Sequence, residues 1–366
     1  MSIYNNNNKV IVAMSGGVDS SVTAALLKES GYKIDALFMK NWEEDDADEC
    51  ISKKDYEDAK RLCKKLGIKM HLVNFSDSYW NLVFKTFLNG LKNGITPNPD
   101  IFCNKEIKFK QFLKYGLSLG CDKVATGHYA KINIVNNCYT LNKPLDKIKD
   151  QTYFLYMLNQ NILKNLLFPL SDINKDDVKK IAKSLDIEIS RKKESMGICF
   201  IGKKKFSDFI KKYIKPNPGL ICDANNMILG NHDGLFNYTI GQRKGINIGG
   251  KKNYLNKPWF VSEKDIKNNK LIISQDENDL LFKGNIILDD VNWISKNIKK
   301  ENLSCKARLR HGGQLIDCAI TNIDNRYILK LNDHERAVTL GQSAVLYTKN
   351  QCLGGGIIKQ KCLASI

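Results

Sequence analysis

The sequence predicts an α/β chain in which a doubly wound parallel sheet is followed by two smaller, mostly-β domains, the last of them a β-barrel. The chain has 366 residues, more than the roughly 250 at which one domain usually stops growing. Its first half alternates short apolar runs with helical patterns, which is typical of βα units and a parallel sheet. After Lys215 the stretch KPNPG and short alternating strands replace the long helices, which indicates a change of domain.

The first half is expected to contain four strands and five helices. Apolar, β-branched runs predict the strands, and apolar residues spaced three and four apart predict the helices. Gly31 and Gly67 are placed to end the first two helices. The expected strands are 9–14, 33–40, 68–75 and 123–130, and the expected helices are 20–30, 55–65, 79–91, 152–167 and 175–185.

The second half is expected to be built from short strands with turn residues between them, which suits small sheets or barrels. Boundaries are expected near 203–216 and near 283–287. The predicted domains are therefore residues 1–205, 206–285 and 286–366. Strands are expected over 270–275, 306–312, 326–331 and 343–349.

Charge and cysteine content limit the partners and the compartment. A formal net charge of +18 favours a polyanionic partner such as nucleic acid. The first nine residues lack the apolar core of a signal peptide, and no apolar run approaches a membrane span, so we expect a soluble, cytoplasmic chain without a membrane partner. Eleven cysteines without a Cys-x-x-Cys pair argue against a disulfide scaffold and a zinc ribbon.

The glycine turn after the first strand, Ser15-Gly16-Gly17-Val18-Asp19-Ser20, predicts an anion site. No lysine follows the glycines and no Gly-x-Gly-x-x-Gly is present, which excludes a Walker loop and a dinucleotide fingerprint. Backbone amides at the following helix start can still cradle an anion. Ser15, Ser20 and Ser21 can add hydroxyl donors, and Asp19 can hold a magnesium ion against the anion.

Two cysteines have neighbours that favour the thiolate form. Cys103 follows a proline-stiffened turn and begins a helical pattern, and a helix start lowers a thiol pKa. Cys199 lies between two glycines and precedes three lysines, and nearby positive charge also favours a thiolate. Taken alone, each is more often an ordinary buried cysteine, so the motifs around them decide.

Those motifs, taken together, resemble the bacterial tRNA-specific 2-thiouridylases, a family of pyrophosphate-loop ATPases with an adenine nucleotide alpha hydrolase-like fold. The resemblance runs almost the full length of the chain. It is carried by ALFMKNWEEDD (36–46), TPNPDIFCNKEIKF (96–109), ATGHYA (125–130), KDQTYFLY (149–156), GICFIGKKKF (197–206), TIGQRKGINIGG (239–250) and GQSAVLYTKNQCLGGGII (341–358).

The resemblance implies a set of site residues. Cys199 would carry a persulfide, Cys103 would be its partner thiol, and the two would end as a disulfide. Asp100 would act as general acid or base by its position. The implied ATP site is Ala13, Met14, Ser15, Gly16, Gly17, Val18, Asp19, Ser20, Met39 and Gly127, and the implied tRNA contacts are Asn98, Pro99, Asp100, Lys149, Asp150, Gln151, Arg310 and His311. His311 stands where enteric members carry tyrosine.

The implied activity is tRNA 2-thiouridine synthesis. ATP, together with Mg²⁺, would place AMP on the C2 oxygen of the wobble uridine, because that oxygen is otherwise a poor leaving group. Sulfur from the Cys199 persulfide would then replace it, giving 2-thiouridine, AMP and pyrophosphate. The implied partners are the anticodon loops of the lysine, glutamate and glutamine tRNAs and a persulfide sulfur-donor protein.

Two other functions remain open on the residues alone. A pyrophosphate-loop ligase would adenylate a carboxylate or another carbonyl and let nitrogen attack, and it would need neither cysteine. A catalytically silent nucleotide-binding or tRNA-binding module would bind tRNA without releasing pyrophosphate. Pyrophosphate release with unmodified tRNA, followed by mass analysis of the wobble nucleoside, separates the three.

Overall fold

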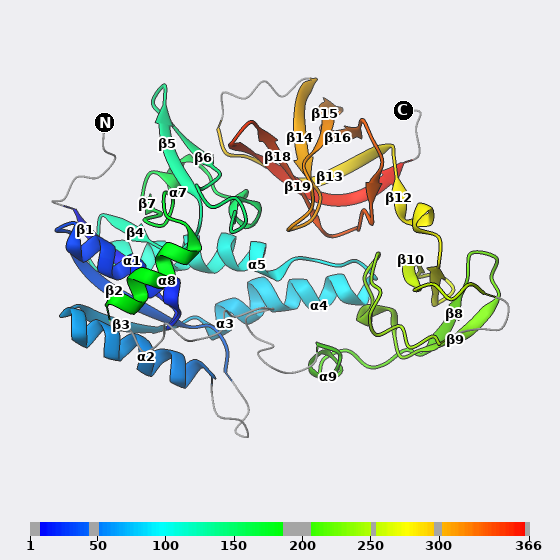
Figure 1. The fold of residues 1–366 in the computed structure, drawn as a ribbon, viewed down its shortest axis with the longest axis horizontal. Helices are drawn as coiled ribbons and strands as arrows, with labels where there is room; N and C mark the ends of the chain where they lie inside the picture. The colour runs from blue at the N-terminus through cyan, green and yellow to red at the C-terminus, as the bar shows by residue number, and fades with distance from the viewer. Residues whose placement is uncertain (1–7, 44–50, 186–205, 250–253, 296–301, 363–366) are drawn as a thin grey trace.

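The computed structural model describes residues 8–43, 51–185, 206–249, 254–295 and 302–362. Three bodies follow one another along the chain: a parallel sheet with helices, a small sheet, and a barrel (Figure 1). This order of a parallel sheet followed by two mostly-β bodies was predicted and is confirmed. Within the described ranges, no helix has the length and apolar character that a membrane crossing requires.

The first body is built on a five-stranded sheet in the order β3-β2-β1-β4-β7. Successive side chains of β1 point to opposite faces of the sheet: Val10, Val12 and Met14 pack in one cluster, and Ile11 packs in another. Helices therefore cover both faces, as a doubly wound sheet requires. The strands are β1 (Lys9–Met14), β2 (Lys33–Lys40), β3 (Lys69–Asn74), β4 (Lys123–Ala125) and β7 (Leu166–Leu167).

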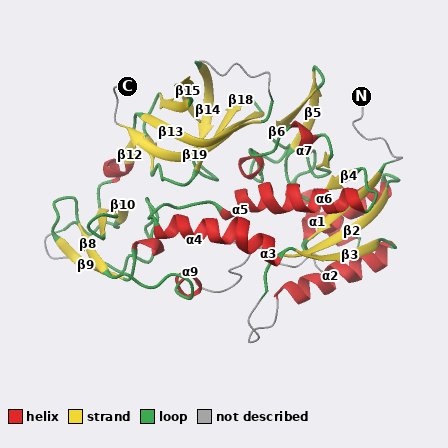
Figure 2. Ribbon diagram, turned by 180° about the vertical axis from the view of Figure 1, so that it is seen from behind, coloured by secondary structure: helices red, strands yellow, loops and turns green. Residues whose placement is uncertain are grey.

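Helices on the first face are long and separate, whereas those on the second face are composite. On the first face lie α1 (Val18–Glu29), α2 (Ile51–Leu66) and α8 (Lys175–Ser184). Two composite helices include π-helical turns and extend toward the small sheet (Figure 2). They consist of α3 (Ser76–Tyr79), η1 (Trp80–Phe84) and α4 (Lys85–Lys92), and of α5 (Pro99–Phe102), η2 (Cys103–Gln111) and α6 (Phe112–Ser118).

The helix expected over 152–167 is wrong. The chain forms a short 3-10 turn η3 (Thr152–Leu155), then α7 (Gln160–Leu163), and then β7. Tyr153 and Tyr156 have a helical spacing, but their hydroxyl groups are bound by Ser343 of the barrel at 3.0 and 3.1 Å. Asn159 then starts a new helix by accepting a hydrogen bond from the Ile162 amide, so tertiary contacts and a cap divide the predicted helix.

The small sheet has the order β10-β11-β8-β9, and the barrel closes through β13-β16-β15-β14-β18-β19 because β19 also pairs with β13. The small sheet follows α9 (Phe206–Ile210) and contains β8 (Gly219–Cys222), β9 (Ile228–His232), η5 (Leu235–Asn237), β10 (Phe260–Asp265) and β11 (Lys270–Ser274). The barrel strands are β13 (Asn285–Trp293), β14 (Leu303–Arg308), β15 (Ile316–Ile323), β16 (Arg326–Leu331), β18 (Ser343–Thr348) and β19 (Gln351–Cys362). Between the small sheet and the barrel lie η6 (Glu277–Leu280) and β12 (Leu281–Phe282), and β12 pairs with β17 (Glu335–Arg336).

One hairpin of the first body belongs to the barrel sheet. β5 (Lys131–Val135) and β6 (Cys138–Asn142) pair with each other, and β6 continues the barrel sheet by pairing with β19 through Cys352 and Leu141. Val345, Tyr347 and Cys352 of the barrel also lie in the same hydrophobic cluster as Ile11 of the parallel sheet. The barrel and the first body therefore share one core, which fixes their relative position.

Candidate active site

The glycine turn lies between the end of β1 and the start of α1. Gly16 has φ of +70°, and a Cβ atom there would lie 2.2 Å from the Asp55 carbonyl oxygen, so only glycine fits. The Ser20 hydroxyl accepts from the Ser15 amide at 3.2 Å and donates to the Gly17 carbonyl at 3.0 Å. The turn is therefore rigid at the amino-terminal end of α1, where backbone amides favour an anion.

Ser21 does not serve as the expected hydroxyl donor in this turn. Its side chain is fully buried, and its hydroxyl donates to the Gly17 carbonyl oxygen at 2.8 Å. Ser15, in contrast, is exposed, and its hydroxyl lies 3.2 Å from that of Ser20. The structure thus leaves Ser15 as the hydroxyl of this turn that solvent can reach.

The turn lies at the point where the sheet changes direction. β2 and β3 lie on one side of β1, and β4 and β7 lie on the other. In open α/β sheets, ligands bind outside the carboxyl ends of the strands at such a switch point. Gly127 follows β4, and a Cβ atom there would lie 2.9 Å from the Asp19 carbonyl carbon and 3.0 Å from the Ser20 amide nitrogen. Two segments predicted to bind ATP therefore meet here.

Met39 lies on the neighbouring strand, near the carboxyl end of β2. Its side chain is partly buried and packs against both hydrophobic clusters of the second face of the sheet. It therefore lies at the same edge of the sheet as the glycine turn. This is where a residue that packs against an adenosine group is expected.

Asp19 has two partners that sequence reasoning missed. Lys175 Nζ lies 2.6 and 2.8 Å from the two carboxylate oxygens of Asp19, and the Tyr129 hydroxyl donates to Asp19 Oδ1 at 3.0 Å. Lys175 is separated from Asp19 by 156 positions and is one of many lysines in the chain, so no local signal marks it. Among the described residues, no group of three or more metal-ligating side chains is present.

Asn98, Pro99 and Asp100 form the start of the composite helix that leads to Cys103. The Asn98 side chain caps this helix by accepting from the Asp100 amide at 3.1 Å, and Pro99 occupies the first helical turn, where its missing N–H costs nothing. Cys103 is 5% exposed and belongs to an aromatic cluster with Phe84 and Phe209. Because one composite helix carries them, the distance between the predicted base contacts and the predicted thiol is fixed.

Cys199 lies outside the described residues. The described chain resumes at Phe206, whose ring lies 6.3 Å from that of Phe87 in the aromatic cluster that contains Cys103. Seven peptide steps separate Cys199 from Phe206, and they can span at most about 25 Å.

Asp100 has an unusual electrostatic environment. Its partial burial raises the pKa of its carboxyl group, and this rise is offset in part by the charges of Lys108 and His311. A carboxyl group with a raised pKa is suited to proton transfer near neutral pH. His311 comes from the barrel, and its imidazole adds positive charge near this predicted catalytic residue only when it is protonated.

A pH dependence follows from this shift. The folded state binds a proton at Asp100 more tightly than the unfolded chain does, so the contribution of Asp100 to stability falls as pH rises above the ordinary value of 3.8 and through the raised pKa. Asp100→Asn is expected to remove that part of the fall. The free energy of unfolding of both proteins is measured in urea between pH 4 and 7. If it changes with pH in the same way in both, Asp100 is not desolvated.

Asp150 of the predicted Lys-Asp-Gln contact is buried and holds two bodies together. Its carboxylate accepts from Arg308 Nη1 of the barrel at 3.0 Å and from the Thr152 amide at 3.0 Å. The side chains of Asp150 and Arg308 are 3% and 14% exposed. Gln151 accepts from the Tyr129 amide at 2.9 Å. Lys149, in contrast to Asp150, is half-buried, so solvent reaches part of this residue.

Arg310 and His311 follow β14 at the rim of the barrel. The His311 ring lies 4.4 Å from the Phe154 ring and 6.0 Å from the Tyr153 ring. Burial and the charge of Arg308 lower the pKa of the imidazole, which favours its neutral form. The structure thus packs His311 on the segment after Gln151 and places it within electrostatic range of Asp100. Arg310 lies within electrostatic range of Glu335.

A barrel turn, residues 339–343, holds the segment before Asn98. The Thr96 amide donates to the Leu340 carbonyl at 2.9 Å, and Gln342 Nε2 donates to the Thr96 carbonyl at 2.9 Å. A Cβ atom on Gly341 would lie 3.0 Å from the Thr96 nitrogen, so the two backbones are in close contact. The barrel therefore positions the segment that carries the predicted base contacts.

Gln342→Ala tests this positioning. It removes one bond to Thr96 and leaves the barrel core intact, so we expect kcat to fall about tenfold, because small displacements of reacting groups are costly. The ATP KM should stay unchanged. Gln360→Ala, on the exposed end of β19, is the matched control. An unchanged kcat in Gln342→Ala would show that Thr96 needs no such support.

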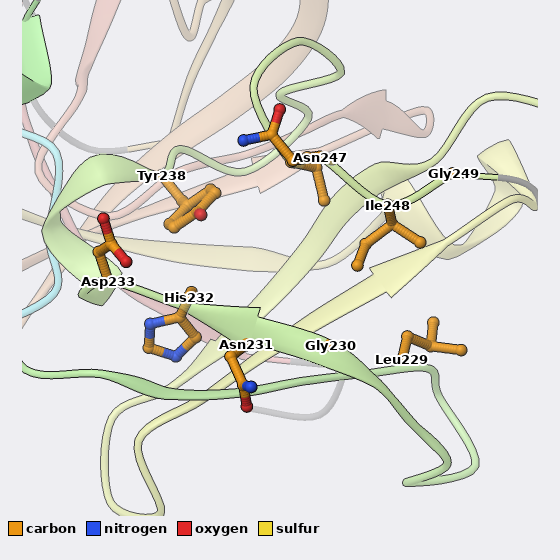
Figure 3. A pocket seen from close by; sticks show the side chains of 10 residues that line it. Leu229, Gly230, Asn231, His232, Asp233, Tyr238, Asn247, Ile248 and Gly249 are labelled. Carbon is orange, nitrogen blue, oxygen red and sulfur yellow. The ribbon is translucent and has the colours of Figure 1, made fainter.

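A separate pocket of about 290 Å³ lies in the small sheet (Figure 3). Its lining includes His232, whose Nε2 lies 3.2 Å from the Asn269 carbonyl oxygen and whose pKa is lowered by burial. None of the residues predicted for ATP, sulfur or tRNA lines it. The lining residues are Leu229, Gly230, Asn231, His232, Asp233, Tyr238, Ile246, Asn247, Ile248 and Gly249.

Three protein-family models match the chain one after another. The model described as a tRNA methyl transferase HUP domain matches residues 8–203. A tRNA methyl transferase PRC-barrel domain matches 207–275, and an aminomethyltransferase beta-barrel domain matches 283–358.

Curated relatives are similar over nearly the whole chain. The tRNA-specific 2-thiouridylase MnmA of Buchnera aphidicola subsp. Acyrthosiphon pisum is 49% identical over 363 residues, which cover 98% of this chain and 99% of that protein. The protein of the same name from Buchnera aphidicola subsp. Schizaphis graminum is 50% identical over 359 residues, 97% of this chain and 98% of that one. That of Aeromonas salmonicida is 46% identical over 360 residues, 98% of each.

Proposed function

The chain belongs to the family of tRNA-specific 2-thiouridylases, and on that premise we propose how its own residues make 2-thiouridine. Its activity is the 2-thiolation of tRNA, a sulfur transfer. The observation that best supports the assignment of residues is that the barrel binds both segments of predicted tRNA contacts. Gln342 donates to the Thr96 carbonyl oxygen at 2.9 Å, just before Asn98, and Arg308 donates to the Asp150 carboxylate at 3.0 Å. A base-binding site assembled from two bodies suits a large substrate such as tRNA.

The first step is activation of the uridine by ATP. The turn from Ala13 to Ser20 holds the phosphates with its amides, and Met39 and Gly127 complete the nucleotide site. The C2 oxygen of the wobble uridine attacks the α phosphate, AMP becomes attached to that oxygen, and pyrophosphate leaves. Asn98 and Pro99 hold the base, which single-stranded loops can present at modest cost. Asp100 exchanges a proton with the uracil ring.

The second step is sulfur transfer. The outer sulfur of a Cys199 persulfide attacks C2, and AMP leaves with the original oxygen. The Cys103 thiolate then attacks the Cys199 sulfur, which frees 2-thiouridine and leaves a Cys103–Cys199 disulfide for a reducing thiol to open. The opposite order, in which Cys103 first releases the outer sulfur as sulfide, ends in the same disulfide. The short chain between Cys199 and Phe206 supports their approach.

Further features of the substrates and partners belong to this proposal. A magnesium ion would neutralise phosphate charge, and Asp19 fits it, because Mg²⁺ in proteins commonly takes one or two carboxylates beside the phosphates. Lys149, Arg310 and His311 would contact tRNA. We propose as substrates the lysine, glutamate and glutamine tRNAs, a persulfide protein as sulfur donor, and the cytoplasm as the compartment.

We also keep the domain limits 1–205, 206–285 and 286–366 as part of the proposal. The matches at 8–203, 207–275 and 283–358 support them. The hairpin of β5 and β6 lies within the first domain in sequence, although it joins the barrel sheet in space.

The experiment that tests this function is pyrophosphate release with unmodified tRNA, followed by mass analysis of the wobble nucleoside. We expect release that depends on tRNA and a nucleoside in which one sulfur has replaced one oxygen. A gain of nitrogen would support the ligase, a gain of a methyl group would support methyl transfer, and tRNA binding without release would support the silent module. Each of these three outcomes would overturn the proposal.

A further inference from the structure

Lys175 is a buried lysine at the edge of the predicted phosphate site. It is the first residue of α8, and its side chain is 8% exposed, which is rare for lysine without a specific partner. Its ammonium group contacts both carboxylate oxygens of Asp19 and lies 5.8 Å from the centre of the Tyr129 ring. The charge is therefore held in one place.

The backbone of Lys175 is held as firmly as its side chain. Its amide donates to Asp146 Oδ2 at 2.9 Å, and Asn174 at the helix cap makes no side-chain cap bond. The other oxygen of Asp146 accepts from the amides of Ile148 and Lys149 at 3.0 and 3.1 Å. Asp146 thus ties the start of α8 to the segment that leads into the predicted tRNA contacts.

The ammonium group lies beside the anion cradle because of where its partner lies. Asp19 is in the first turn of α1, directly after the glycine turn. Gly127 approaches the backbone of Asp19 and Ser20 from β4, and Tyr129, two residues later, binds the Asp19 carboxylate. A phosphate held by the amides of this turn would have Asp19 and the Lys175 ammonium as its charged neighbours.

We propose that Lys175 is the phosphate-binding cation of the ATP site, supplied by α8 to a glycine turn that has no lysine of its own. Without nucleotide, Asp19 holds the ammonium in place. When ATP binds, the ammonium exchanges a carboxylate oxygen of Asp19 for a phosphate oxygen, and it stays with the pyrophosphate as that group leaves. The Asp19 carboxylate is then open to a divalent cation. This inference rests on the ATP site of the proposed function.

The exchange has a physical reason. A paired lysine and aspartate are together neutral, so the empty site carries little charge and the buried ammonium remains solvated by a partner. ATP brings phosphate oxygens that accept charge-assisted hydrogen bonds at least as well as a carboxylate does. Because the charge on the leaving pyrophosphate grows in the transition state, the ammonium is expected to act on kcat as well as on ATP binding.

The test compares Lys175→Met and Lys175→Arg with Lys180→Met, a control on the same helix whose exposed lysine pairs with Asp177. We measure ATP affinity without tRNA by calorimetry, the rise in melting temperature that ATP produces, and pyrophosphate release at saturating tRNA. Lys175→Met is expected to weaken ATP binding by about tenfold to a hundredfold, the usual effect of one charged hydrogen bond, and to lower kcat. Lys175→Arg should retain part of the ATP affinity and part of kcat. Lys180→Met should leave the ATP affinity and kcat unchanged.

A purely structural ion pair would give a different result. Lys175→Met would then melt at a lower temperature, but ATP would raise its melting temperature as much as in the wild type, and this would overturn the inference. If Lys175→Met does not fold, Lys175→Arg and Lys175→Gln decide the matter by the same ATP-induced rise. Failure of the proposed function is distinguishable, because the wild type would then make no 2-thiouridine whatever the ATP affinity of the variants.

Discussion

Replacing Cys199 by alanine is expected to reduce 2-thiouridine formation by at least about a thousandfold, the effect typical of losing a nucleophile. Pyrophosphate release with unmodified tRNA should persist, because the uridine oxygen and ATP react before any sulfur is needed. Mass analysis of the wobble nucleoside and a pyrophosphate assay on the same samples measure both. Retained thiolation in this variant would overturn the persulfide assignment.

Cys103→Ala separates the two orders of sulfur transfer. In a single turnover of enzyme loaded with persulfide, both orders lose free product, but they leave different species. If the persulfide attacks C2 first, tRNA stays joined to Cys199 through a disulfide; if Cys103 must first release sulfide, the adenylated tRNA stays unattached to the enzyme. One round of product followed by arrest shows that another thiol can release it and that Cys103 serves to regenerate the enzyme. Cys362 lies at the end of β19. Cys362→Ala is the control and should behave as the wild type in the single turnover and in later rounds.

Arg308→Met is expected to lower the free energy of unfolding by about 3 kcal/mol or more, because it leaves the buried Asp150 carboxylate without its ion partner. The Arg308 guanidinium also lies 5.4 Å from the centre of the Tyr347 ring, so packing is lost along with charge. Because this pair joins β14 to the Lys-Asp-Gln segment, tRNA affinity should fall as well. Urea unfolding and filter binding of tRNA measure the two effects.

Lys306 on the same strand provides the matched control. Its ion pair with Asp317 has exposed partners, and exposed pairs contribute at most about 1 kcal/mol. Lys306→Met should therefore leave the stability nearly unchanged. The double variant Arg308→Met with Asp150→Asn should recover part of the loss, because it removes the unpaired charge. Equal effects of Arg308→Met and Lys306→Met would show that Arg308 does not secure the interface.

Local signals in the sequence were sufficient for several of the strands and for the glycine turn, although the strand expected over 123–130 ends at Ala125 and β5, β6 and β7 were not predicted. The strands 33–40 and 326–331 were predicted with the ends that the structure has, because each is a short apolar run bounded by polar or turn residues. Gly16 could be recognised because its neighbours in sequence already define a strand, a tight turn and a helix start. The structure adds the reason that position 16 must be glycine: a Cβ atom there would lie 2.2 Å from the Asp55 carbonyl oxygen.

Distant partners were beyond such signals. Lys175 matters because Asp19 lies beside it in space, and a charge pair 156 positions apart leaves no periodic pattern. β6 joins the barrel through a register set by Cys352 and Leu141, which no run of residues in either strand encodes. Asp150 was predicted as a tRNA contact by resemblance, and its burial against Arg308 could be seen only once the two bodies were placed together.

The most direct test of the central claim follows the oxygen atom that sulfur replaces. Unmodified tRNA carrying oxygen-18 at C2 of the wobble uridine is converted by the wild-type enzyme with ATP and a persulfide donor, and the released AMP and pyrophosphate are weighed. If ATP turns that carbonyl oxygen into a leaving group, each 2-thiouridine formed should be accompanied by one AMP that carries the heavy oxygen, and pyrophosphate should carry none. AMP without the label, formed alongside 2-thiouridine, would contradict the account.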